Sequence, residues 1–164
     1  MRVSGLDLSV TATGAAHTVE GAGCTHLIKP RSSRDLRLPE IRARVLEYIQ
    51  GSELIIIEGY LNHSHTAGIT GMVHGAVRSM LVEEGFTYAT LPPSSLKKFA
   101  TGRGGASKTD MAVAAFKRGG VEFTNDNECD AWWLWVAAND HLGQPVFSLP
   151  KLQRDALDAL TMEN

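Results

Sequence analysis

The chain has 164 residues, a length that suits one compact domain and is short for two. Hydrophobic residues make up 43% of it and charged residues 21%, as in ordinary globular proteins. The formal net charge of -2 argues against a generally basic nucleic-acid coat, but it allows a local basic stripe.

The two cysteines, Cys24 and Cys129, form no CxxC motif. We therefore expect neither a disulfide framework nor a structural zinc site, and a reducing cytosol fits this pattern. The first residues begin a strand pattern and lack the apolar core of a signal peptide. No apolar stretch reaches membrane-spanning length. These features predict a cytoplasmic protein that does not bind membranes.

Short apolar segments separated by glycine-rich turns predict an antiparallel meander at the start of the chain. Its three strands are expected at residues 2–9, 14–19 and 24–28. Apolar residues at helical spacing then predict an amphipathic helix over 38–50, ended by Gly51. The continuous aliphatic run 54–58 is typical of a central strand that is covered on both faces.

The second half of the chain alternates helices with one further strand. A long helix rich in glycine and alanine, a strand before Pro92 and a short helix are expected at 66–84, 87–91 and 94–99. Ser107 and Asp110 are typical of a helix N-terminus, which predicts a helix to about Arg118. Two more helices are expected at 125–139 and 151–162.

This order of elements predicts an α/β fold with a mixed five-stranded sheet. A three-strand antiparallel meander lies beside parallel central strands, and helices flank the sheet. The first, fourth and fifth strands can run parallel at its centre. Neither an internal repeat nor a long linker interrupts the pattern.

Three carboxylates occupy strongly apolar parts of this pattern. Asp7 lies in the first strand, Glu58 ends the aliphatic run, and Asp130 stands beside three tryptophans in a late helix. Buried acids are costly unless they are paired or bound to a cation. If the three converge, their oxygens suit a hard divalent metal. Taken singly, each acid also fits a solvated strand end or the first turn of a helix, but the ordered combination is more specific.

A fourth metal ligand is less certain from the pattern. Asn127 stands three residues before Asp130, so both side chains can face one site on a helix. It offers a neutral amide oxygen, and the neighbouring acids Asp126 and Glu128 can replace it if the helix starts differently.

The acidic motifs resemble those of the RuvC family of Holliday-junction resolvases, within the RNase H-like superfamily. The motifs are Gly5-Leu6-Asp7-Leu8-Ser9 with Thr13-Gly14, then Ile56-Ile57-Glu58-Gly59-Tyr60, then Asn127-Glu128-Cys129-Asp130-Ala131. The resemblance covers about residues 2–141 and is nearer to short, divergent phage-type members. Asn127 departs from the acid that usually opens the last motif.

The resemblance implies a nuclease domain over residues 1–142, with 143–164 as a C-terminal extension of the same domain that carries a short helix. It implies two Mg²⁺ ions, for which Mn²⁺ substitutes, held by Asp7, Glu58 and Asp130, with Asn127 as a further ligand. A homodimer would cut symmetrically related strands of a four-way DNA junction. The setting would be the cytoplasm of a bacterium or a phage-infected cell.

A basic segment around a Gly-rich loop supplies the expected DNA contacts: Lys97, Lys98, Arg103 and Lys108. Lys97 and Lys108 have the spacing of two lysines near the scissile phosphate in the resembling family, and we expect both to neutralise developing charge there. Tyr60 follows Glu58 closely and either stacks on opened bases or packs in the core.

The sequence leaves several functions open. A structure-selective DNA endonuclease acting on Holliday junctions or related branched DNA is preferred. A junction-binding protein with weak catalysis remains open because of Asn127, and so does a nuclease acting on RNA–DNA hybrids, because a fold does not set its substrate. A small nucleotide-binding module of the actin or sugar-kinase type would leave Glu58 and Asp130 unexplained.

Overall fold

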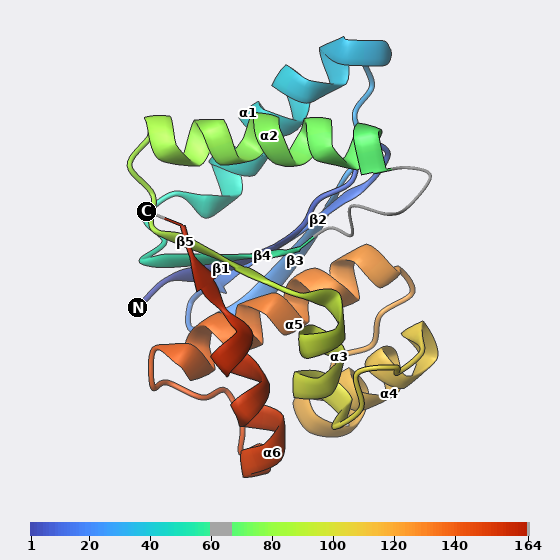
Figure 1. Cartoon of the computed structure of the whole chain (residues 1–164), viewed down its shortest axis with the longest axis vertical. Helices are drawn as coiled ribbons and strands as arrows, with labels where there is room; N and C mark the ends of the chain where they lie inside the picture. The colour runs from blue at the N-terminus through green and yellow to red at the C-terminus, as the bar shows by residue number, and fades with distance from the viewer. Residues whose placement is uncertain (60–66, 164) are drawn as a thin grey trace.

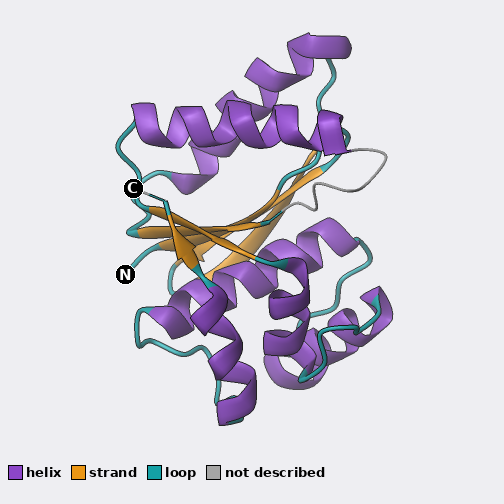
Figure 2. Ribbon diagram, in the orientation of Figure 1, coloured by secondary structure: helices purple, strands orange, loops and turns teal. Residues whose placement is uncertain are grey.

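The structure is a computed structural model that describes residues 1–59 and 67–163. It forms three layers, with a twisted sheet between two groups of helices (Figure 1, Figure 2). The strands are β1 Val3–Asp7, β2 Thr13–Val19, β3 Ala22–Ile28, β4 Leu54–Glu58, β5 Tyr88–Leu91 and β6 Thr161–Met162. The α-helices are α1 Arg37–Ile49, α2 Ala67–Glu83, α3 Pro93–Thr101, α4 Lys108–Gly119, α5 Asp126–His141 and α6 Lys151–Arg154.

The sheet is mixed, and its strand order is β3-β2-β1-β4-β5-β6. β1, β2 and β3 form an antiparallel meander, while β4 runs parallel to both β1 and β5. The expected architecture is therefore confirmed, with the parallel strands at the centre. Among the described residues no helix is both long and apolar enough to cross a membrane.

The tail departs from the single helix expected over 151–162. It is α-helical only in α6, continues as a 3-10 helix over Asp155–Ala159, and then turns into β6. Leu160 takes an extended backbone, and Thr161 and Met162 pair with β5. Without β6, β5 would be an edge strand with unpaired backbone N–H and C=O groups. Pairing with Thr161 and Met162 gives these groups hydrogen-bond partners, and a sixth strand therefore replaces the end of the predicted helix.

The helix start predicted at Ser107 and Asp110 is present at the N-terminus of α4. Ser107 accepts a hydrogen bond from the Asp110 backbone, and the Asp110 carboxylate accepts one from the Ser107 backbone. This reciprocal capping box confirms the predicted helix start. It also places Lys108 as the first residue of α4.

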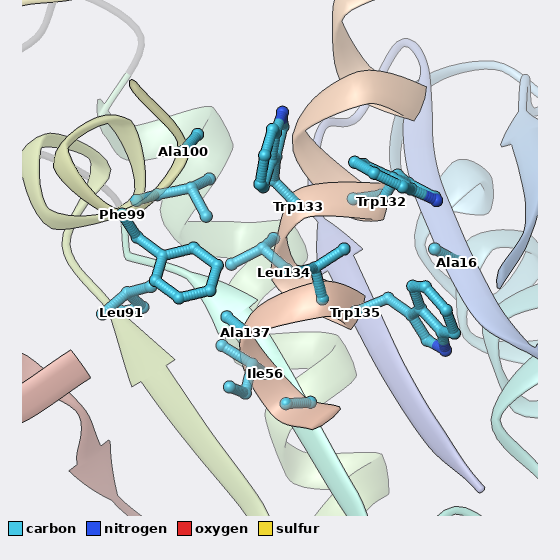
Figure 3. Packing of buried hydrophobic residues seen from close by; sticks show 14 of the residues in the cluster. Ala16, Ile56, Leu91, Phe99, Ala100, Trp132, Trp133, Leu134, Trp135 and Ala137 are labelled. Atoms are coloured by element: carbon cyan, nitrogen blue, oxygen red, sulfur yellow. The ribbon is translucent and has the colours of Figure 1, made fainter. Parts of the chain in front are cut away.

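Each face of the sheet has its own apolar core. One core lies between the sheet and α1 and α2, and the other lies under α5 and includes the three tryptophans. Trp133 packs edge-on against Phe99 of α3, with ring centroids 6.1 Å apart (Figure 3). Its indole nitrogen donates to the Met111 carbonyl. The tryptophans therefore pack in this core and anchor α5 to its neighbours.

Three glycines allow α5 to lie directly on the meander. A Cβ added to Gly5 would overlap the Ala131 carbonyl of α5, and one added to Gly14 would overlap the Asn127 carbonyl. A Cβ at Gly23 would come within 2.7 Å of the Trp135 ring. The missing side chains on β1, β2 and β3 therefore bring the α5 backbone close to the sheet, and with it the residues at its N-terminal end.

Candidate active site

The three acids come from three elements that meet at one edge of the sheet. Asp7 is the last residue of β1 and Glu58 the last residue of β4. The two strands are parallel neighbours, so their carboxyl ends lie side by side. Gly5 lies under α5. Asp7 follows it by two residues on the same strand, so the Asp7 side chain points to the same face of the sheet, toward that helix. Asp130 lies in the second turn of α5.

The electrostatics of these acids shows that they share one environment. Burial raises the pKa of Asp7 to about 7, and the negative charge of Asp130 adds to the shift. Burial raises the pKa of Glu58 to about 8, with further contributions from Asp7 and Asp130. Burial also raises the pKa of Asp130 to about 6. Each carboxylate is thus costly to ionise here without a nearby cation.

Two lysines partly offset this negative charge. Lys97 of α3 and Lys108 of α4 both lower the pKa of Glu58 and of Asp130. The Lys108 ammonium forms an ion pair with Asp126, and this hydrogen bond raises the pKa of Lys108. Both lysines singled out in the sequence therefore lie near the acids. The Lys108–Asp126 pair was missed, because its partners lie on separate helices and no local pattern links them.

The three residues considered for a fourth ligand have different surroundings. The Asn127 amide donates to the Ala12 carbonyl at 2.5 Å, so it holds the turn after β1. The Glu128 carboxylate accepts a hydrogen bond from the Thr25 hydroxyl at 3.3 Å, toward β3. The charge of Asp126, by contrast, raises the pKa of both Asp7 and Asp130. Asp126 is therefore the acid of the three that is electrostatically coupled to the site.

The remaining basic residues lie on α3 and in the loop before α4. Lys98 follows Lys97 on α3, so the two side chains project from the helix about 100° apart around its axis. Arg103 is exposed in the loop before α4, and its guanidinium pairs with Asp110 at 3.2 Å. Tyr60, the candidate for stacking on bases, lies outside the described residues.

The donor set is made of oxygen atoms and suits a hard divalent cation. Among the described residues, three His, Cys, Asp or Glu ligand atoms lie within 4.8 Å of one another only at His17, Cys24 and His26. The oxygens of Asp7, Glu58 and Asp130 thus spread beyond that span.

Comparison with known proteins supports the fold. No protein-family model and no curated protein matches the sequence. A solved structure of Thermus thermophilus RuvC has a TM-score of 0.69 and 23% sequence identity, covering 88% of this chain and 98% of that one. T. thermophilus RuvC in complex with a Holliday junction substrate has a TM-score of 0.68 and 25% identity, covering 88% of this chain and 97% of that one.

The strand order, the parallel centre and the helices on both faces agree with these structures over most of the chain. The resemblance first seen in three short acidic motifs therefore extends to the whole arrangement of the sheet. In its fold, this chain is RuvC-like, within the RNase H-like architecture.

Proposed function

We propose that this protein is a divalent-metal-dependent endonuclease that resolves Holliday junctions or related branched DNA by paired nicks. The observation that carries the proposal is the meeting of Asp7, Glu58 and Asp130 from β1, β4 and α5, where burial raises the pKa of all three and Asp130 adds to the shift of the other two. The similarity to a RuvC structure in complex with a Holliday junction substrate supplies the substrate class.

Mg²⁺ is the proposed cofactor, with two ions as in two-metal phosphodiester hydrolysis. Asp7 would hold them together with Glu58, whose pKa the Asp7 charge raises, and with Asp130, whose charge raises the pKa of Asp7. Glu58 and Asp130 each complete one side, and Asp126 supports the Asp130 side in addition to Asn127. When bound, the ions supply Lewis acidity that stabilises charge on the scissile phosphate.

The lysines have a distinct role at the phosphate. Their positive charges already lower the pKa of Glu58 and of Asp130. Lys97 and Lys108 would neutralise phosphate oxygens as charge develops in the transition state. Lys98 and Arg103 are proposed to hold the DNA backbone further out, and Tyr60 to stack on an opened base.

The test is cleavage of a synthetic four-way junction in Mg²⁺, with the nick positions mapped on every strand. We expect symmetric paired nicks from the natural chain, and retained junction binding without cleavage from Asp7→Asn. A linear duplex of the same sequence serves as the substrate control. Full cleavage by Asp7→Asn would overturn the proposed metal site.

The same assay separates the two alternatives. Junction binding with no nicks in Mg²⁺ or Mn²⁺ would identify a binding protein with weak catalysis, the reading that Asn127 keeps open. Preferential cleavage of an RNA–DNA hybrid over the junction would identify an RNase H-type nuclease.

A further inference from the structure

A second cluster of metal-binding side chains lies on the hairpin formed by β2 and β3. His17 and Cys24 are directly opposed across the two strands. His26 follows Cys24 by two residues, so its side chain emerges on the same face of the sheet. One ligand atom from each residue lies within 4.8 Å of the others.

The distances within this cluster match those of a tetrahedral metal site. The Nε2 atoms of His17 and His26 are 3.1 Å apart, and His26 Nε2 is 3.6 Å from the Cys24 Sγ. Metal–nitrogen bonds of about 2.0 Å and metal–sulfur bonds of about 2.3 Å at tetrahedral angles separate the ligand atoms by roughly 3.3 and 3.6 Å. Two of the three separations are thus close to these values, and all three ligand atoms lie within 4.8 Å of one another.

The surrounding residues hold the rings in this arrangement. The His26 ring stacks on Tyr48 of α1, with centroids 3.9 Å apart and an interplanar angle of 10°. His17 Nδ1 is buried and has no hydrogen-bond partner among the described residues, so this ring acts through Nε2. All three residues are only half-buried, which leaves a path for an ion and room for a water as fourth ligand.

The charged groups near the cluster are compatible with a bound cation and thiolate. Arg2 acts on His17, while Arg44 and Glu128 act on His26 with opposite signs. Burial is the main cause that lowers the pKa of both histidines.

This cluster is separate from the acidic site. His17 pairs with Ser4 of β1, three residues before Asp7, which is about 10 Å along the strand. The neighbouring residue, Ala16, packs in the core under α5. Adjacent residues of a strand point to opposite faces, so the His17 side chain lies on the other face of the sheet, toward α1. The donors also differ, because nitrogen and sulfur select softer metals than carboxylates do.

We propose that His17, Cys24 and His26 bind one Zn²⁺ ion through two imidazole nitrogens and one thiolate, with a water in the fourth position. The ion would join β2 to the edge strand β3 and stabilise the outer side of the meander. This site is independent of the proposed nuclease function, and it differs from the expectation that a chain without a CxxC motif has no structural zinc.

The test titrates the full-length chain with Co²⁺ as a spectroscopic substitute for Zn²⁺, in excess Mg²⁺ to occupy the acidic site. We expect one Co²⁺ per chain, a sulfur-to-cobalt charge-transfer band in the near ultraviolet, and displacement of both signals by Zn²⁺. Cys24→Ser should remove the band, and His26→Gln should lower Zn²⁺ affinity by about tenfold or more.

Cys129→Ala is the matched control, because Cys129 is the other free cysteine and is buried against the second core. It should keep the band at full intensity. Absence of the band in the natural chain, or its persistence in Cys24→Ser with loss in Cys129→Ala, would overturn the proposal. Circular dichroism of each variant shows whether it is folded. If Cys24→Ser does not fold, the Zn²⁺ affinity of His26→Gln provides the test.

Discussion

Asp7, Glu58 and Asp130 each have a pKa above the usual carboxyl range, and burial is the main cause in all three. In the unfolded chain the same groups would titrate near 3.8 to 4.5. Between those values and about pH 6 to 8, the folded protein therefore binds more protons than the unfolded one. Stability contributed by these acids must fall as pH rises through that window.

This sign gives a prediction for Asp7→Asn in metal-free buffer. The advantage of the variant over the natural chain should grow from about pH 4 to 7 and then level off, because a pKa raised from 3.8 to about 7 corresponds to about 4 kcal/mol in the free energy of unfolding. Histidines with lowered pKa, among them His17 and His74, change stability in the opposite direction, so the measured quantity is the difference between the two proteins.

Chemical denaturation at several pH values in the presence of a chelator measures this difference. Added Mg²⁺ should reduce it, because a bound cation stabilises the ionised carboxylates of the natural chain. A difference that is flat with pH, or a less stable Asp7→Asn at pH 8, would contradict the assignment of Asp7 to a buried acidic site.

Lys108 is the second residue-scale test, since its ammonium is placed among Asp7, Asp126 and Asp130. Lys108→Met should lower the rate of junction cleavage by about 10²–10³-fold, the usual cost of removing one transition-state charge contact, with little change in affinity. Lys117→Met, at the exposed far end of the same helix, is the control. Equal rates for the two variants would remove Lys108 from the proposed catalytic group.

At the scale of elements, the position of α5 depends on the glycines beneath it. Gly14→Ala would force its Cβ into the Asn127 carbonyl, which is backbone and cannot turn aside. We expect a loss of about 1–3 kcal/mol or more in stability and a displaced N-terminal end of α5. Because Asp130 moves with that end, cleavage should fall further than the loss of folded protein explains.

Thermal unfolding and cleavage measured on the same preparation distinguish these two effects. Gly105→Ala is the matched control, because a Cβ there meets nothing within 4 Å. Natural stability in Gly14→Ala would show that α5 is not in direct contact with β2.

The C-terminal elements are joined to the rest of the molecule by polar contacts that the sequence pattern did not reveal. Arg154 of α6 donates to the buried Asp140 carboxylate of α5 at 2.8 Å. Arg78 of α2 pairs with Glu163 beside β6, also at 2.8 Å. Arg154→Ala leaves a buried acid without this partner and, because the Arg154 side chain is half-exposed, should cost about 1–3 kcal/mol in the free energy of unfolding. Denaturant titration measures this loss of stability. A loss smaller than that caused by removing the exposed ion pair Lys151–Asp155 would contradict the prediction.

At the scale of the whole molecule, paired nicks need two copies of the site. α2 has an outer surface suited to a second copy: Ile69 and Met72 are 51% and 48% exposed, and Gly68 and Gly75 have open space around them. Ile69 and Met72 also line a hollow of about 270 Å³. A symmetric contact through this surface is the proposed dimer interface.

Met72→Glu should therefore produce a folded monomer, since it places a charge in the proposed interface and disturbs no buried residue. Sedimentation or light scattering measures the mass. On a supercoiled plasmid carrying a cruciform, the monomer should nick single strands where the natural dimer linearises the molecule. Val82→Glu, 62% exposed on the same helix, is the control and should remain dimeric. A dimeric Met72→Glu would place the interface elsewhere.

Much of this protein is determined by local sequence. The aliphatic run that forms β4, the capping box of α4 and the order Asp7, Glu58, Asp130 follow from residue type and spacing over a few positions. Such signals depend on propensity and periodicity, so they were enough to predict the mixed sheet and the three acids.

Tertiary structure decided what depends on contacts between distant segments. β6 forms because β5 offers an unpaired edge, and local helix propensity does not contain that information. Asp126 pairs with Lys108 across two helices, and His17 approaches Cys24 and His26 only in the register of the hairpin. Spacing along the chain singled out Asp7, Glu58 and Asp130 but not His17, Cys24 and His26, because ligand geometry across a hairpin depends on its three-dimensional register.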